Sequence, residues 1–396
     1  MWLSLVEGVE KILFKNKKRA AVFAVVITIV LFVGNWFYCN NPFNPYYKVK
    51  NLRNLPEGTP VYIGDNKLFF AGSYSGYYSE NKKDEKITCA SVYDIKKQKN
   101  IPLNTCMNVP RNHYIPILLD SNRVLILGGT GKDSPEYNVG KVAEIYDIKE
   151  NRFRRVENSK IACNSFTKME KINKNNFLLV HAGNGQIFNS TLETFNLIGQ
   201  TKCYFLQDNI KICNNIPLHG VEIIKLSDES ILFVGQKRKS NTENAMIYNC
   251  KENRFLPTGS QIYPQSARTL IKLSNNNILI VGGNDIFQTR ENNSYITGQK
   301  KTEIYNIKKK EFSEFATLNR GRSNPIVLNI NDKIFVFGGQ EGETFNTSYP
   351  KEVEMCHIAE KKWEKIGRIK RGFSYGNAIK INSKEYIIGK NYIKFK

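Results

Sequence analysis

Histidine is scarce in this sequence, and the familiar catalytic and metal-binding motifs are missing. The four histidines, His113, His181, His219 and His357, show no metal-ligand spacing, and no CxxC pair occurs. No HExxH motif, phosphate-binding loop or nucleophile elbow is present. We therefore expect no metal, no cofactor and no catalytic residue.

Acidic residues are also few, with 36 Asp and Glu against 58 Lys and Arg and a formal net charge of +22. Such a charge predicts attraction to anionic partners but says nothing about the fold. A bias towards Lys, Asn and Ile throughout the chain would explain it equally well.

Long apolar runs are absent except at residues 20–38, which read AAVFAVVITIVLFVGNWFY without a charge. This run is long enough to span a bilayer as a helix. Lys15, Lys17, Lys18 and Arg19 precede it and predict a cytoplasmic N-terminus, residues 1–19. No small-residue cleavage site follows, so we expect an uncleaved signal anchor, a short linker at 39–45 and an exported domain at 46–396. Export makes nucleic acid an improbable partner despite the charge.

After residue 38 the pattern is almost entirely that of short β-strands, and one phrase returns along the chain. An apolar run ends in small residues, and a strand with a spaced Tyr, a basic turn and an aromatic residue follows. The clearest copies are VLILGG with AEIYDIKENRF, ILIVGG with TEIYNIKKKEF, and IFVFGG with VEMCHIAEKKW. Weaker copies bring the number to seven, spaced roughly 47 to 57 residues apart, which is typical of propeller blades.

The glycine pair after an apolar strand and the spaced aromatic residues resemble the kelch repeat, over about residues 46–396. The resemblance implies a seven-bladed, all-β propeller of the kind found in the galactose oxidase central domain, with four strands in each blade. The paired glycines Gly128, Gly129, Gly282, Gly283, Gly338 and Gly339 would close the second strand of three blades. The other copies depart from this pattern, because they lack one or both glycines.

The last copy lacks a fourth strand, and residues 46–52 (YYKVKNL) match the sequence of one. We expect this segment to close the ring, so that no blade edge stays open. The linker would then join the face that carries the turns between third and fourth strands, which are rich in lysine. These turns predict contact with an anionic membrane surface; lysine is also the usual solvated residue of hairpin turns.

Candidate binding residues fall in two groups. Arg111, Asn112, His113, His219, Arg268, Arg322 and Arg371 stand at or near the start of the first strand of their blades. In kelch proteins an Arg at this place often links blades, which is one interpretation; an inward ring of guanidinium groups that binds an anion is the other. The long loops between second and third strands carry Tyr77, Tyr137 and Tyr295, and a Tyr-, Asn- and Ser-rich composition suits recognition.

Cysteines close in sequence are disulfide candidates in an exported domain, namely Cys89 with Cys106 and Cys203 with Cys213. Cys250 and Cys356 are expected as buried free thiols.

Two functions follow from these features. The first is a membrane-anchored, non-enzymatic module that binds a protein or a glycan through its membrane-distal loops. The alternative is an exported carbohydrate-processing enzyme, because some exported kelch-like propellers are sialic-acid mutarotases; Glu222, Arg268 and Arg322 are the residues that would serve such a pocket.

Overall fold

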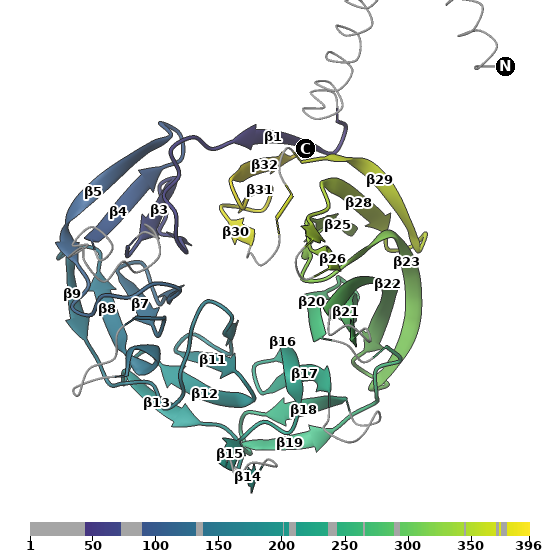
Figure 1. Cartoon of the computed structure of the whole chain (residues 1–396), viewed down its shortest axis with the longest axis horizontal. Helices are drawn as coiled ribbons and strands as arrows, with labels where there is room; N and C mark the ends of the chain where they lie inside the picture. The colour runs from purple at the N-terminus through teal and green to yellow at the C-terminus, as the bar shows by residue number, and fades with distance from the viewer. Residues whose placement is uncertain are drawn as a thin grey trace, which may run out of the picture.

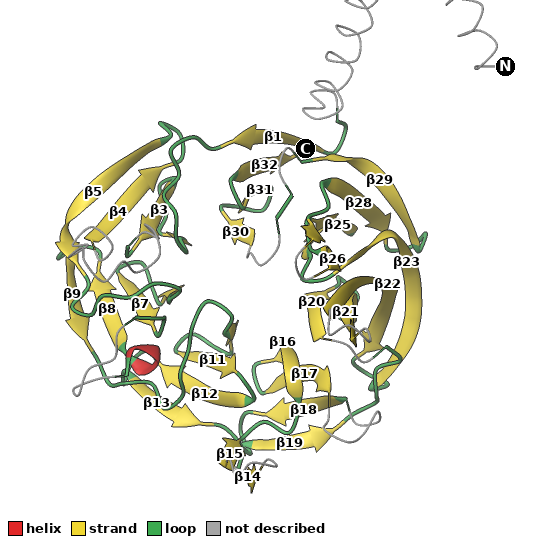
Figure 2. Ribbon diagram, viewed as in Figure 1, coloured by secondary structure: helices red, strands yellow, loops and turns green. Residues whose placement is uncertain are grey.

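The computed structural model describes residues 44–72, 89–131, 138–200, 202–205, 211–236, 244–263, 266–288, 294–343, 346–369, 372–373 and 378–396. Strands fill this part of the chain, and its one helix is the short η2 (Val139–Lys141) (Figure 2). The strands form seven blades around a central opening, which confirms the predicted all-β, seven-bladed propeller (Figure 1).

The first three blades run from the channel outward in chain order. They consist of β2 (Val61–Tyr62), β3 (Lys67–Phe70), β4 (Cys89–Asp94) and β5 (Lys99–Cys106); β6 (Ile115–Leu118), β7 (Arg123–Leu127), β8 (Ala143–Asp147) and β9 (Arg152–Arg155); and β10 (Lys168–Lys171), β11 (Asn176–His181), β12 (Asn184–Asn189) and β13 (Thr194–Leu197).

The next three blades follow the same order. They consist of β16 (His219–Ser227), β17 (Ser230–Gln236), β18 (Ala245–Asn249) and β19 (Arg254–Pro257); β20 (Ser266–Lys272), β21 (Ile278–Gln288), β22 (Ser294–Asn306) and β23 (Glu311–Arg322); and β24 (Ile326–Ile330), β25 (Lys333–Phe337), β28 (Glu352–His357) and β29 (Lys362–Arg368).

The seventh blade joins the two ends of the described chain. Its inner strands are β30 (Ala378–Lys380), β31 (Glu385–Ile388) and β32 (Asn391–Phe395), and β1 (Tyr47–Asn51) pairs antiparallel with β32 as the outer strand. Tyr47 lies opposite Phe395, and its ring packs edge-on to Phe337 of the sixth blade. The segment that follows the linker therefore completes the last sheet.

The blades pack face to face, and their middle strands are buried on both sides. The side chains of Val124 to Leu127 in β7 are fully buried, and so are those of Val336 and Phe337 in β25. Outer strands such as β5 alternate between exposed and half-buried residues instead. Short apolar runs therefore become the second strands, because only these positions lie between two neighbouring blades.

The paired glycines lie where neighbouring blades approach most closely. Gly128 and Gly129 have φ values of 59° and 120°, and a Cβ on Gly128 would lie 2.2 Å from the carbonyl oxygen of Cys163 in the next blade. The Gly129 N–H donates to that same carbonyl. Glycine is required at this position both for its left-handed backbone and for the space.

Two hairpins add to the seven blades. β14 (Lys202–Phe205) and β15 (Lys211–Asn214) form a separate pair that opposes Cys203 and Cys213, whose disulfide stays a prediction. β26 (Glu341–Glu343) and β27 (Asn346–Ser348) belong to the loop of the sixth blade but join β22 of the fifth. The sequence predicted only irregular loops here, because these strands are polar and lack apolar alternation.

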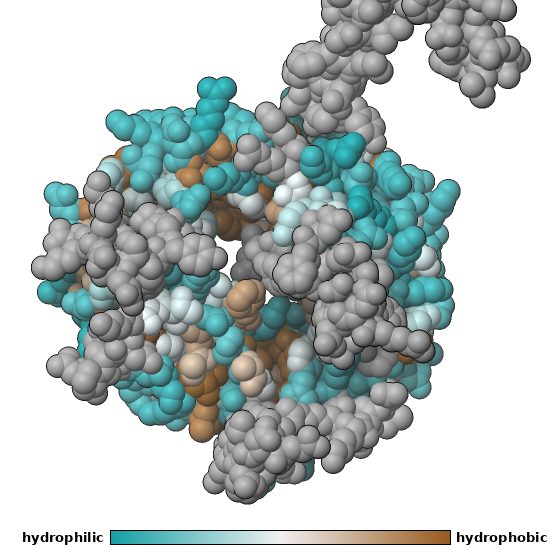
Figure 3. All heavy atoms as spheres, in the orientation of Figure 1, coloured by the Kyte–Doolittle hydropathy of each residue, from teal (hydrophilic) through white to brown (hydrophobic). Residues whose placement is uncertain are grey.

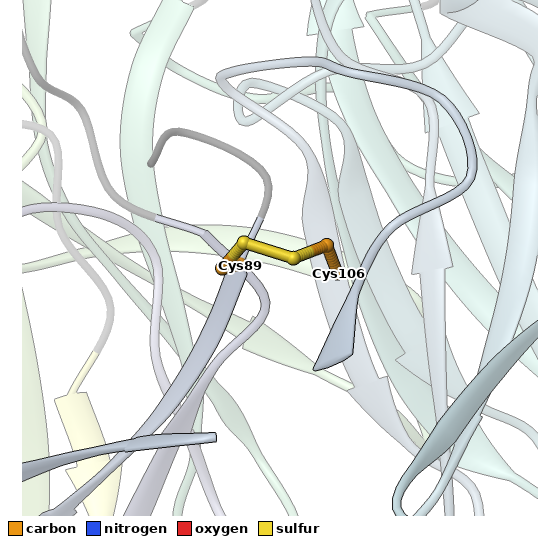
Figure 4. The surroundings of a disulfide bond; sticks show 2 residues. All are labelled: Cys89 and Cys106. Atoms are coloured by element: carbon orange, nitrogen blue, oxygen red, sulfur yellow. A yellow bond between two sulfur atoms is a disulfide. The ribbon is translucent and has the colours of Figure 1, made fainter. Parts of the chain in front are cut away.

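A disulfide links Cys89 and Cys106, which face each other on β4 and β5 and lie 17 residues apart in sequence (Figure 4). Cys163, Cys250 and Cys356 are free thiols. Within the described ranges, no helix has the length and hydropathy to cross a membrane. The predicted anchor, residues 20–38, lies outside those ranges.

Candidate binding site at the channel mouth

A repeated backbone step marks one end of the inner strands. The residue two positions before the strand core adopts a left-handed conformation in four blades, with φ values of 52° at His113, 56° at Gly220, 59° at Ala267 and 48° at Asn324. The residue before each step pairs with a residue that directly follows the apolar run of the second strand. These pairs are Asn112 with Thr130, His219 with Gln236, Ser266 with Asn284, and Ser323 with Gln340.

These eight residues and His113, which we call the collar, carry neutral polar side chains at the mouth of the channel. His113 Nδ1 lies 3.1 Å from the Thr130 hydroxyl, and the Ser266 hydroxyl donates to Asn284 Oδ1 over 2.7 Å. The Asn324 N–H donates to the Ala267 carbonyl, which joins the collar across the fifth and sixth blades. Asn112, Ser323 and Gln340 are buried, whereas the other six collar residues are exposed or half-buried. The accessible amide, hydroxyl and imidazole groups can both donate and accept hydrogen bonds.

Arg111 and Arg322 lie beneath the collar, not on it. Arg111 Nη1 binds Glu144 Oε1 at 2.5 Å, and Arg322 Nη2 binds Glu354 Oε1 at 3.0 Å; all four side chains are fully buried. Burial lowers the pKa of both arginines, and the glutamates oppose this effect. The contacts support the interpretation in which these arginines hold blades together, because protein carboxylates already occupy the groups that an external anion would need.

Each of these glutamates also accepts hydrogen bonds from the backbone leading to the arginine. Glu144 accepts from the N–H groups of Asn108 and Val109, and Glu354 accepts from those of Asn319 and Arg320. The sequence carried a signal for them, since a Glu precedes the spaced Tyr or Cys in AEIYD and VEMCH, in blades that also keep both glycines. The sequence alone did not indicate that these glutamates are buried partners of the arginines.

Arg268 is three residues beyond the position of Arg111 and Arg322 and lies on β20 itself. It is buried, and its Nη2 donates to the Tyr263 carbonyl over 2.6 Å. The Glu303 carboxylate nearby accepts the N–H groups of Ile262 and Tyr263, both at 2.9 Å. Burial raises the pKa of Glu303, which the charge of Arg268 partly offsets.

A second carboxylate, Glu222, is mostly buried on β16, between the inner strands of the third and fifth blades. Lys168 of β10 reaches it with Nζ at 2.8 Å from Oε1. Burial raises the pKa of Glu222, while the charges of Lys168 and Arg268 lower it in part. Three successive inner strands therefore share one group of charges, and Lys168 is the member that sequence reasoning missed.

The remaining predicted site residues contribute less to the geometry. His219 is half-buried in the collar, and Tyr295 lies on β22 opposite Glu343 of β26. Arg371, Tyr77 and Tyr137 lie outside the described residues. In the part of the chain that the structure describes, no three His, Cys, Asp or Glu side chains gather to hold a metal ion.

The fold defines the class of protein as a seven-bladed β-propeller. A solved structure of a fungal alcohol oxidase of the AA5 family, in complex with copper, is similar to 89% of this chain and 76% of that one, with a TM-score of 0.59 and 12% identity. At this identity the likeness shows the fold alone. No protein-family model and no curated protein match the chain.

Proposed function

We propose that the protein is a membrane-anchored, exported propeller of the kelch type, and that it binds a glycan at the channel mouth. The collar carries this proposal. Its side chains are neutral hydrogen-bonding groups on a rigid ring of strands, which suits the many hydroxyls of a sugar better than it suits a charged or an apolar ligand. Tyr349, which is exposed between β27 and β28, would extend the contact area.

Export is proposed from the apolar run at 20–38 and is supported by the Cys89–Cys106 disulfide. Disulfides persist in oxidising compartments and are rare in the cytosol. The proposed topology places the N-terminus in the cytoplasm and the propeller on the periplasmic or extracellular side.

A glycan array tests the proposed function, with the full chain in detergent. We expect saturable binding that His113→Ala and Asn284→Ala each weaken, because both substitutions remove collar groups. Asn196→Ala on the outer strand β13 is the matched control and should bind normally. Binding of peptides with no binding of glycans would favour a protein partner and refute the glycan proposal.

A second candidate function rests on Glu222. A buried carboxyl with a raised pKa beside Lys168 and Arg268 is suited to proton transfer, as an exported sugar-processing enzyme such as a mutarotase requires. Anomer exchange of a sugar acid, followed by NMR with Glu222→Gln as the control, tests it. Turnover that depends on Glu222 would support the enzyme, and saturable binding without turnover would exclude it.

A further inference from the structure

The third blade departs from its neighbours at the channel mouth. Its second and third strands, β11 and β12, are joined by Ala182 and Gly183 alone, in a tight left-handed turn with φ values of 47° and 78°. In the fifth blade, β21 and β22 continue past the glycine pair and add β26 and β27. The third blade therefore contributes no collar residue, and its surface at this end comes from the residues before β10.

Phe166 takes the place of a polar or small residue in this blade. It precedes β10 by two residues, as His113 precedes β6 and Asn324 precedes β24. The residue is 59% exposed. An exposed aromatic ring offers a ligand a flat apolar face. Figure 3 shows apolar atoms bordering the central opening among hydrophilic ones.

The local backbone holds Phe166 in place. Its N–H donates to Asn164 Oδ1 over 2.9 Å, the Asn164 N–H donates to the Thr167 hydroxyl over 3.0 Å, and the Thr167 N–H closes the turn on the Asn164 carbonyl. An aromatic ring on such a closed turn loses little freedom when a ligand covers it.

A donor and an acceptor of hydrogen bonds lie close to Phe166 in the fold, one on the following strand and one on the neighbouring blade. Lys168, two residues on, is 37% exposed and donates, while its partner Glu222 is 13% exposed and accepts. A pyranose ring has the complementary surface, since one face presents C–H groups and the edges present hydroxyls. Neither a purely apolar ligand nor a simple anion would use both parts.

We infer that Phe166 and the Lys168–Glu222 pair form a subsite for one pyranose ring, with its C–H face on Phe166 and its hydroxyls towards the ion pair. This inference rests on the proposed glycan-binding function and assigns one sugar of the ligand to the third blade.

Tryptophan fluorescence tests the subsite in the full chain in detergent. Phe166→Trp places a reporter on the turn, and we titrate it with methyl β-galactopyranoside, methyl α-glucopyranoside and N-acetylglucosamine. A saturable blue shift with at least one sugar is expected. Leu192→Trp, at a side chain 71% exposed in the turn between β12 and β13, is the matched control and should not respond.

Two further variants separate the subsite from the function. Phe166→Ala should weaken binding of the best array glycan roughly tenfold, and Phe166→Tyr should restore it, because a tyrosine ring offers the same face. Unchanged glycan binding by Phe166→Ala, or equal responses of the two Trp reporters, would overturn the subsite and leave the proposed function standing. Failure of the wild-type chain to bind any glycan would refute both.

Discussion

The positions that recur in the repeat have two roles. Some side chains hold the blades together, and others lie at the channel mouth. The buried pairs Arg111–Glu144 and Arg322–Glu354 belong to the first kind, because no solvent reaches them. Each glutamate accepts hydrogen bonds from backbone N–H groups and from a guanidinium. In this way Glu144, on the third strand of the second blade, holds the segment that connects the first blade to the second. Such a network is stable only as a whole.

Glu144→Ala should therefore cost about 3–5 kcal/mol of the free energy of unfolding, because it leaves the Arg111 charge buried without its partner. Denaturant unfolding of the full chain measures this cost. Glu157→Ala removes a carboxylate from the exposed pair with Lys160 and should change stability by less than about 0.5 kcal/mol. Equal effects of the two substitutions would contradict a structural role for the buried pair.

Gly128→Ala should destabilise the propeller by more than Gly64→Ala. Both glycines have positive φ, 59° and 93°, but a Cβ would meet the Cys163 carbonyl at 2.2 Å only at Gly128, and nothing lies within 4 Å of it at Gly64. Backbone strain alone costs of order 1–3 kcal/mol, and the collision adds to it. The difference in melting temperature between the two variants measures the destabilisation caused by the overlap with the Cys163 carbonyl. Equal melting temperatures would show that the blades can move apart to make room for the Cβ.

Glu222 should make stability depend on pH in a predictable direction. Burial raises its pKa above the ordinary 4.5 in the folded state, so its favourable contribution is complete below 4.5 and is lost as the pH rises through the folded-state pKa. Glu222→Gln removes this loss, and Lys168→Met should move it to higher pH, since the ammonium lowers the pKa. Denaturant unfolding at a series of pH values gives the curves; parallel curves for wild type and Glu222→Gln would count against the shift.

At the scale of elements, the period of the sequence predicted the blades well, because each middle strand is an apolar run between fixed turns. It could not show which polar side chains are buried together. Glu144 and Arg111 lie on different strands, and only the packed blade brings them into contact. The β26–β27 hairpin was missed for a related reason: it pairs with β22 of another blade, and nothing local encodes that pairing. Phe166 was missed because the repeat is weakest in the third blade.

The closing strand β1 is the element on which the ring depends most. Tyr47 is 3% exposed and packs against Phe337 and Phe395, so Tyr47→Ala should cost about 3–5 kcal/mol through the lost contacts and the cavity. Lys48→Ala on the same strand is exposed and should be neutral. Hydrogen exchange should show faster opening of β32 in the Tyr47 variant; an effect confined to β1 would mean that the seventh blade stands without its outer strand.

The whole molecule has two faces, and the start of the described chain identifies one of them. Asn44 donates from Nδ2 to the Ile366 carbonyl, and Lys333, at the turn between β24 and β25, lies over the Tyr46 ring. The chain thus leaves the propeller on the face of the turns that follow first and third strands, opposite the collar. Exposed lysines on this face are Lys96, Lys97, Lys149, Lys251, Lys308, Lys309, Lys310, Lys361 and Lys362. If residues 20–38 span a bilayer, this face is the one nearest to it.

Charge reversal tests whether these lysines hold the propeller against an anionic membrane. Lys308→Glu, Lys309→Glu and Lys310→Glu together should remove at least about 3 kcal/mol of attraction, at about 1 kcal/mol for each cation near the surface, and the added carboxylates should be repelled as well. The full chain in nanodiscs, with and without phosphatidylglycerol, gives the measurement as hydrogen-exchange protection of residues 307–311. Lys300→Glu, Lys301→Glu and Lys351→Glu change the same charge away from this face and should leave the protection intact. Lys300 and Lys301 lie within β22, before the turn that follows it, and Lys351 directly precedes β28. Equal protection in neutral and anionic discs would show that these lysines contribute only to solubility. The propeller would then be free to tilt on its linker, and the distance between the collar and the membrane would not be fixed.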